Sequence, residues 1–302
     1  MKFPSFYFPW LQKGNPTGTV DRYPALDGYV SSVPGLYCVG DLTGVPLIKL
    51  AAESGYAIIE DLHADSAFRD EVSANAASDI NDVVIVGAGP AGMAAALRAE
   101  ALGYRAVLIE SSQVFNTIAN FPKGKPIYVT PVEPPMKSAL AFSDGTKETL
   151  LEELRRHVAE SQVTVHEGEN VQHIAGTIGA FEVRTSKVAY KARRVIVAIG
   201  KSGNARALGV PGETLPKVFT RLIDPGEHNG QDILVVGGGD SALEAAVALA
   251  DAGNRVTLSY RKPSLSRPKE QNLAAFTEAV EEGRIRPLFE SKLKEIRQDD
   301  VV

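Results

Sequence analysis

The sequence contains almost no cysteine, and its few histidines are scattered. The single cysteine, Cys38, cannot form an internal disulfide, a Cys-x-x-Cys redox pair or a cysteine zinc site. The five histidines lack the close spacing of a metal cluster. No metal site is therefore expected, and the chain by itself holds no redox dithiol.

Excess positive charge and long apolar runs are also missing. Lys and Arg number 32 against 37 Asp and Glu, and the resulting net charge of −5 argues against binding nucleic acid, which requires a basic surface. The longest nearly apolar stretch, residues 83–97, is too short to cross a bilayer and is interrupted by glycines and a proline. No secretory signal is apparent at the N-terminus, so we expect a soluble, cytoplasmic chain without a transmembrane segment.

One arrangement of residues occurs twice. At residues 82–102 and again at 232–252, a β-branched run ends in glycines and continues into a stretch rich in alanine and leucine. Each predicts a buried parallel strand, a tight turn and a helix, and a second strand follows at 105–109 and at 255–260. The length of 302 residues fits about two domains. We therefore predict an α/β chain with two Rossmann-like, three-layer dinucleotide-binding domains.

The remaining segments predict the elements between the two units and after the second one. We expect an amphipathic helix at 146–159, strands at 163–166, 181–185, 194–200, 284–289 and 292–297, and a crossover between the domains at 208–216. Residues 63–80 are rich in Ala, Ser and Asp without an apolar period. We interpret them as a linker, with a solvent-exposed helix as the alternative.

The first glycine motif carries the features of a dinucleotide site. Gly87-x-Gly89-x-x-Gly92 follows a strand and opens a helix, and Glu110 ends the next strand, 23 positions after Gly87. The first glycine permits the turn, the second lets the backbone approach a pyrophosphate, and the third lets helix and strand pack closely. The acidic residue can bind both ribose hydroxyls of an adenosine. The alternative is a glycine-rich turn without a ligand.

The second glycine motif differs at the end of its second strand, where cations replace the acid. A guanidinium can bind a 2′-phosphate that a carboxylate would repel, so this domain is predicted to prefer NADPH. The alternative is a solvated basic loop. The predicted contacts are Gly237, Gly239, Ser241, Ala242, Arg261, Lys262 and Arg267.

A third motif, Gly40-Asp41, follows a strand and precedes a helix. Together with the two glycine motifs it resembles the flavoprotein reductases of the thioredoxin reductase type. In that family the Gly-Asp segment closes the FAD domain near the C-terminus, and its aspartate binds the flavin ribityl chain. Here it precedes Gly87 by 46 positions (87 minus 41), so the segment order is permuted.

The resemblance extends to a specific branch of the family. Residues 116–122 resemble the flavin-side loop of bacillithiol disulfide reductases and ferredoxin–NADP reductases, which makes Asn120 a candidate FAD contact. Where thioredoxin reductases carry their Cys-x-x-Cys, residues 217–225 contain no sulfur. Bacillithiol disulfide reductases are expected to have a cysteine where this chain has Ala91.

The resemblance implies a domain plan. Residues 1–62 would complete the FAD domain at 81–210, the linker 63–80 would join them, and 211–302 would form an NAD(P)H domain. In the family the NADPH domain continues beyond the strands expected here, so the chain is either a fragment or a shortened, permuted reductase.

The resemblance also implies a function, an FAD-dependent oxidoreductase that takes hydride from NADPH without a catalytic side chain. The acceptor would be a one-electron carrier, a fused redox domain or a small molecule. Whether the chain forms a homodimer is left open. The rival hypothesis is a regulatory or scaffold module that binds FAD without turnover. A flavin-free NAD(P) dehydrogenase is disfavoured by the Gly40-Asp41 motif.

Two features are judged structural. Cys38 lies within an apolar strand and is read as a core residue rather than a nucleophile. For the aromatic residues near the N-terminus, packing against the protein's own fold or against a missing C-terminal portion is favoured over docking to a partner domain or membrane; these residues are Phe3, Phe6, Tyr7, Phe8 and Trp10.

Overall fold

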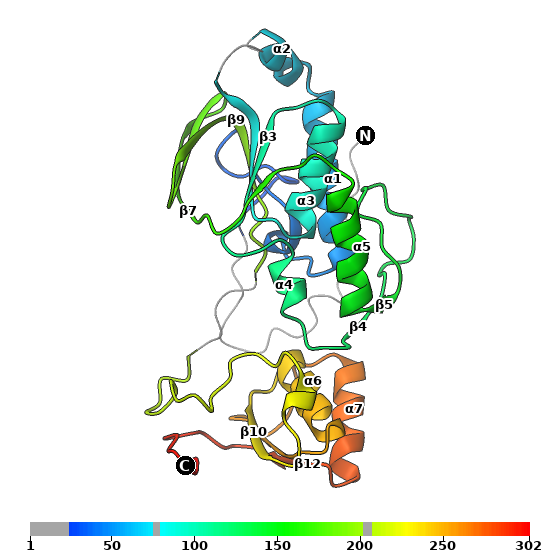
Figure 1. The fold of residues 1–302 in the computed structure, drawn as a ribbon, viewed down its shortest axis with the longest axis vertical. Coiled ribbons are helices and arrows are strands. Elements are labelled where there is room, and N and C mark those ends of the chain that lie inside the picture. The colour runs from blue at the N-terminus through cyan, green and yellow to red at the C-terminus, as the bar shows by residue number, and fades with distance from the viewer. Residues whose placement is uncertain (1–23, 75–78, 202–206) are drawn as a thin grey trace. The chain divides into compact units, whose positions relative to one another are not determined.

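The computed structural model describes residues 24–74, 79–201 and 207–302, which form two units (Figure 1). The larger unit holds residues 24–120 and 124–201 of this range, and the smaller unit holds 121–123 and 207–302. The N-terminal aromatic residues lie outside the described range. Within that range, no helix is both long and apolar enough to cross a membrane.

The larger unit is built on a seven-stranded sheet in the order β6-β3-β2-β9-β8-β7, with β1 also paired to β9. Strands β6, β3, β2, β9 and β1 run parallel, whereas β8 and β7 are antiparallel to their neighbours. The strands are β1 (Leu36–Cys38), β2 (Asn81–Val86), β3 (Ala106–Ile109), β6 (Val165–His166), β7 (Val171–Thr177), β8 (Ala180–Thr185) and β9 (Ala189–Val197). A separate pair joins β4 (Pro126–Ile127) to β5 (Gly145–Thr146).

The early segment of the chain is an integral part of this sheet. Strand β1 pairs in parallel with β9, with Leu36 opposite Val195, and β2 pairs with the same stretch of β9. Because β2 occupies one edge of β9, β1 lies along the other edge. The 3-10 turn η1 (Gly40–Thr43) follows β1 and leads to helix α1 (Ile48–Ala64).

Apolar and small residues explain the helices of the larger unit. Helix α3 (Pro90–Ala101) is rich in alanine and nearly all buried, and α1 packs directly against it (Figure 1). Helix α5 (Lys147–Ala159) buries Leu150, Leu151 and Leu154 on one face, as its sequence period predicts, and Thr146 caps it in a capping box with Thr149. The short helix α4 (Asn116–Ala119) follows β3.

Helix α2 (Ser66–Ala74) occupies much of the segment that we interpreted as a linker. Its one buried residue, Phe68, lies under the Arg194 guanidinium, 4.9 Å from the ring centroid. The Glu71 carboxylate pairs with Arg194 at 3.0 Å and with Arg193 at 3.5 Å, and both arginines are buried in β9. Phe68 and the ion pairs of Glu71 with the two arginines hold this helix in place. Because only one of its residues is both apolar and buried, its sequence shows no apolar period.

The smaller unit has a three-stranded parallel sheet in the order β10-β11-β12. Its core is formed by Leu243 and Leu249 of α6, Leu258 of β11 and Phe276 of α7. The elements are η2 (Pro225–Glu227), β10 (Asp232–Val236), α6 (Asp240–Asp251), β11 (Arg255–Ser259), α7 (Glu270–Glu281) and β12 (Ile285–Leu288).

The strand expected at residues 292–297 does not form, and that expectation was wrong. Ile296 makes only an isolated bridge to Val301, while its N–H donates to the carbonyl oxygen of Pro211 at 2.9 Å. The polar alternation of this segment resembles a strand. However, the segment packs on the 208–216 crossover rather than extending the β10-β11-β12 sheet.

Candidate dinucleotide sites

The turn after β2 has the geometry that its three glycines predict. Gly87 has φ +102°, in the region that L side chains rarely adopt, and a Cβ at Gly92 would lie 1.8 Å from the Gly87 carbonyl oxygen. In contrast, a Cβ at Gly89 would meet nothing within 4 Å. Gly89 therefore has free space beside the backbone at the N-terminus of α3, where anions bind favourably.

Both backbone groups of Ala88, between the first two glycines, are held in place. The Ala88 N–H donates to Glu110 Oε2 at 2.9 Å, and the Ala88 carbonyl accepts from the Phe115 N–H at 2.9 Å. Glu110 Oε1 also accepts from the Ser112 N–H at 2.8 Å. We predicted that Glu110 binds a ribose; the structure adds that it orders the glycine turn. Because a carboxylate has about four acceptor positions, capacity remains for a ribose hydroxyl.

The Gly40-Asp41 turn lies next to this glycine motif despite its distance along the chain. Gly40 has φ +74°, and a Cβ there would lie 2.9 Å from the Cβ of Ala91, within the glycine motif. The Gly40 N–H donates to Ser54 Oγ of α1 at 2.9 Å. The carboxyl ends of β1 and β2 thus meet at one edge of the sheet, where α/β proteins bind ligands.

Asn120 lies at the end of α4 and is engaged locally. Its Nδ2 donates to the Asn116 carbonyl at 2.7 Å and to Asn116 Oδ1 at 2.9 Å. Phe115 precedes this helix, and its N–H donates to the Ala88 carbonyl. Asn120 is therefore one short helix away from the glycine turn, and its role as an FAD contact stays a prediction.

The second glycine turn repeats the open position. A Cβ at Gly239 would meet nothing within 4 Å, and Gly239 is the N-cap of α6. Gly238 is tightly covered, because a Cβ there would lie 2.3 Å from the Tyr260 ring. Tyr260 is buried directly after β11, so it closes one side of the turn and leaves the Gly239 side open.

The predicted phosphate-binding cations lie on one loop. Arg261 and Arg267 are exposed and Lys262 is half-buried, all between β11 and α7, while Ser241 is exposed in the first turn of α6. The loop follows the carboxyl end of β11, the neighbour of β10, so the structure brings these cations to the edge of the sheet that carries the glycine turn.

Lys49 is absent from the predicted site residues, although it is a lysine that is only 2% exposed. Its ammonium donates to three backbone carbonyls of one loop, those of Pro131 at 2.5 Å, Val132 at 2.8 Å and Pro134 at 2.6 Å. Glu53, one turn further along α1, accepts from the N–H groups of Lys137 and Ser138. A lysine between apolar residues at the start of α1 was the available signal. Helix α1 thus fastens the proline-rich loop to the larger unit.

Lys49→Met is expected to destabilise the larger unit by about 3 kcal/mol or more, because three backbone carbonyls lose a buried, charged donor. Urea unfolding followed by circular dichroism measures the effect. Lys187→Met is the matched control, since that exposed ammonium meets a single carbonyl, that of Glu167, at 3.2 Å. We expect the control to change stability by less than about 0.5 kcal/mol. Equal effects of the two variants would contradict the role assigned to Lys49.

The one cysteine lies in the core, as predicted. Cys38 is 7% exposed within β1, and its burial raises the pKa of its thiol. A buried thiol with a raised pKa is a poor nucleophile, because the thiolate is the reactive form. Cys38 therefore does not provide a redox thiol.

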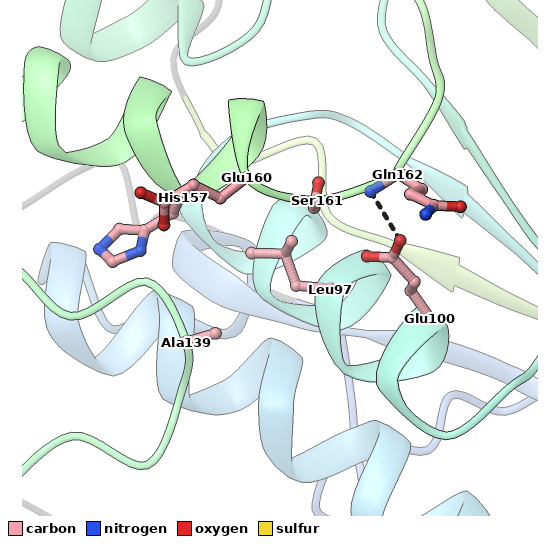
Figure 2. A pocket seen from close by; sticks show the side chains of 7 residues that line it. All are labelled: Leu97, Glu100, Ala139, His157, Glu160, Ser161 and Gln162. Atoms are coloured by element: carbon pink, nitrogen blue, oxygen red, sulfur yellow. Dashed lines mark hydrogen bonds between the residues drawn. The ribbon is translucent and has the colours of Figure 1, made fainter.

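A polar surface hollow lies at the opposite end of α3 from the glycine turn (Figure 2). Leu97 and Glu100 of α3 and His157 of α5 contribute to its lining, and Glu100 Oε1 accepts from the Gln162 N–H at 2.6 Å (Figure 2). The His157 ring is engaged with the Ala141 carbonyl at 2.9 Å. The hollow is separate from the candidate dinucleotide sites.

The fold and the two open glycine turns define an α/β protein with two dinucleotide-binding units. The chain belongs to the pyridine nucleotide-disulphide oxidoreductase family, whose sequence model matches residues 84–302. The predicted family, fold class and enzyme class are thereby confirmed. The predicted cofactors, FAD and NADPH, are those that this family uses.

Similar proteins include reductases with different acceptors. The chain is 30% identical over 227 residues to bacilliredoxin reductase Bdr of Bacillus subtilis, covering 72% of this chain and 69% of that protein. It is 32% identical over 195 residues to a ferredoxin–NADP reductase of Ignicoccus hospitalis, covering 63% and 59%. The solved bacillithiol disulfide reductase Bdr of Bacillus cereus superposes with a TM-score of 0.65 at 29% identity, over 73% of this chain and 71% of that one.

The matched residues start at 84, so β1 and α1 precede the region that defines the family. The chain spans 59% of the Ignicoccus reductase, less than two thirds of its length. The pairing of β1 with β9 and the packing of α1 on α3 place this early segment in the same unit as the first glycine motif.

Proposed function

We propose that the chain is an NADPH-dependent flavoprotein oxidoreductase that binds FAD in its larger unit and NADPH in its smaller unit. The observation that carries this proposal is the space beside Gly89 and Gly239, each at the N-terminus of a helix that follows a parallel strand. Space of this kind lets a backbone approach a pyrophosphate closely. FAD, when bound, supplies a flavin that accepts hydride and passes electrons onward.

In the larger unit, the residues act by binding and orienting. Gly89 leaves room for the pyrophosphate, and Glu110 holds the turn through Ala88 while offering an acceptor to the ribose. Gly40 and Asp41 approach the same helix N-terminus from β1, and we assign the Asp41 carboxylate to the flavin ribityl chain. The permuted segment would thus complete the FAD site within the chain.

In the smaller unit, Gly239 would receive the pyrophosphate of NADPH. Arg261, Lys262 and Arg267 would surround its 2′-phosphate from the loop after β11. A guanidinium presents several N–H donors in a planar fork that fits phosphate oxygens.

The number of thiols narrows the class of electron acceptor. These 302 residues contain one cysteine, and it is buried, so electrons do not leave through a dithiol of this chain. A one-electron carrier, a fused redox domain or a small molecule fits this arrangement better than a protein disulfide.

The visible spectrum of the purified protein tests the proposal. We expect flavin absorbance that NADPH bleaches under anaerobic conditions and that oxygen restores. A yellow protein that NADPH does not bleach would support an FAD-binding module without turnover, and a colourless protein that gains no flavin from added FAD would contradict both.

Arg261→Ala is expected to weaken NADPH about tenfold while affecting NADH by less than about twofold, because only NADPH carries the 2′-phosphate. Flavin reduction rates over a range of each coenzyme measure this difference. The effect should shrink at high salt, because Arg261 is exposed. Arg286→Ala, which removes an exposed arginine from β12, is the matched control and should leave the preference unchanged. Equal losses for both coenzymes would contradict the assignment.

A further inference from the structure

The loop that carries the three cations is anchored at both ends. At its start, the buried Tyr260 ring covers Gly238 in the glycine turn. At its end, the Lys269 N–H donates to Asp240 Oδ1 at 2.8 Å. Between these points, Leu265 packs against the core of the smaller unit. The loop is therefore fixed relative to the glycine turn rather than attached only through β11 and α7.

Asp240 is the residue that joins these elements. It is the first residue of α6, directly after Gly239, and its Oδ1 also accepts from Asn272 Nδ2 of α7 at 2.7 Å. The same Asn272 amide donates to Glu244 Oε1, one turn further along α6, at 3.1 Å. One carboxylate oxygen thus links the start of α6 to the last residue of the loop and to the first turn of α7.

The charge of Asp240 is unfavourable for the function we propose. A carboxylate beside the N-terminus that receives a pyrophosphate repels the ligand, even though it stabilises the helix itself. Its hydrogen bonds to Lys269 and Asn272 direct it toward α7. A residue whose charge opposes the ligand and whose hydrogen bonds fix the neighbouring loop is expected to act through that loop.

We infer that Asp240 is a positioning residue that sets the preference for the 2′-phosphate of NADPH. This inference rests on the proposed function of the smaller unit. Asp240 holds the loop end two residues after Arg267, so that Arg261 and Arg267 are oriented before the coenzyme arrives. A binding site that is ordered in advance loses less conformational entropy on binding, and the gain applies only to a ligand that the loop contacts. A ligand without a 2′-phosphate does not benefit.

The affinities of the whole chain for 2′,5′-ADP and 5′-AMP, measured by isothermal titration calorimetry, test this inference. The two ligands differ only in the 2′-phosphate. We expect wild type to prefer 2′,5′-ADP, and Asp240→Ala to weaken 2′,5′-ADP about tenfold while changing 5′-AMP by less than about threefold. Asp240→Asn keeps a side-chain oxygen that accepts both hydrogen bonds, so it should retain most of the preference. Asp251→Ala, at the other end of α6, is the control for loss of a carboxylate.

A second pair of variants breaks the same contact from the loop side. Lys269 has φ −63°, which proline adopts, and Lys269→Pro removes the N–H that Asp240 accepts. Lys269→Ala removes the same ammonium but keeps that N–H. We expect the proline variant to have the lower 2′,5′-ADP preference of the two, by about threefold or more. This comparison remains informative if Asp240→Ala fails to fold.

The remaining outcomes separate the two ideas. If wild type binds 2′,5′-ADP no better than 5′-AMP, the NADPH assignment falls and the inference falls with it. If wild type has the preference but Asp240→Ala and Lys269→Pro keep it, the assignment stands and the positioning role is overturned. Tighter binding of both ligands to Asp240→Ala would show that the carboxylate acts only through its charge, which also overturns the inference.

Discussion

Gly89→Val is expected to leave the chain folded and to weaken FAD binding by more than about a hundredfold. Nothing lies within 4 Å of a Cβ at this position, and its φ of −77° suits valine, so neither the Cβ nor the backbone is strained in the folded chain. The branched side chain would instead occupy the space through which the backbone approaches the pyrophosphate. Flavin content after purification and FAD titration of the flavin-free protein measure the loss.

The same substitution in the other unit is the matched control. Gly239→Val also places a side chain into free space, and we expect it to keep FAD and to lose NADPH. Both variants should melt within a few degrees of wild type, because the N-cap change costs under about 1 kcal/mol. Unchanged flavin content in Gly89→Val would show that FAD does not lie against this turn.

Gly55→Ala is expected to destabilise the larger unit by about 3 kcal/mol or more, because a backbone clash forces two packed helices apart. A Cβ at Gly55 of α1 would lie 1.8 Å from the Ala91 carbonyl oxygen and 3.1 Å from the Ala95 nitrogen of α3. Neither backbone atom can move without displacing α3, whose N-terminus faces the candidate FAD site. Flavin content should therefore fall together with stability in urea unfolding experiments.

In the flavin-free protein, Gly89→Ala is the stability control for Gly55→Ala, because it adds the same methyl group where no neighbour lies within 4 Å. The sign of the effect is also informative, since Gly→Ala inside a helix ordinarily stabilises by about 1 kcal/mol. A Gly55→Ala protein as stable as wild type would mean that α1 does not pack on α3 as described. The early segment would then not be integral to the larger unit.

The two glycine turns were predictable from the sequence because their conformations are local. A strand, a residue with positive φ and a helix N-terminus follow one another within a dozen residues, and only glycine meets those backbone requirements at Gly87. The same holds for α5, whose capping residue Thr146 and apolar face belong to one short segment. The assignment of Asn120 and of the cations as ligand contacts remains a prediction.

Contacts between distant segments could not be predicted from local sequence patterns. The apolar residues around Lys49 indicate that it is buried, but they do not indicate that its ammonium binds a loop more than 80 residues away, and Asp240 gives no sign of its bond to Lys269. Helix α2 has a single buried apolar residue, so its sequence lacks the period that marks a helix, and buried arginines of β9 hold it instead. At 292–297 the reverse applies, because a segment with a strand-like pattern packs on the 208–216 crossover instead of pairing with a strand of the β10-β11-β12 sheet.

The sequence by itself therefore determined the α/β class, the two glycine turns at the starts of α3 and α6, and the lack of a second cysteine within these 302 residues, since each depends on residue type and short-range spacing. The family resemblance implied that the early segment completes the first domain, but only the tertiary structure decided how β1 and α1 do so, because strand pairing depends on which edge is free and helix packing on which surfaces are small enough. Neither condition depends on the order of the segments along the chain. A permuted segment can therefore satisfy them as well as one in the usual position.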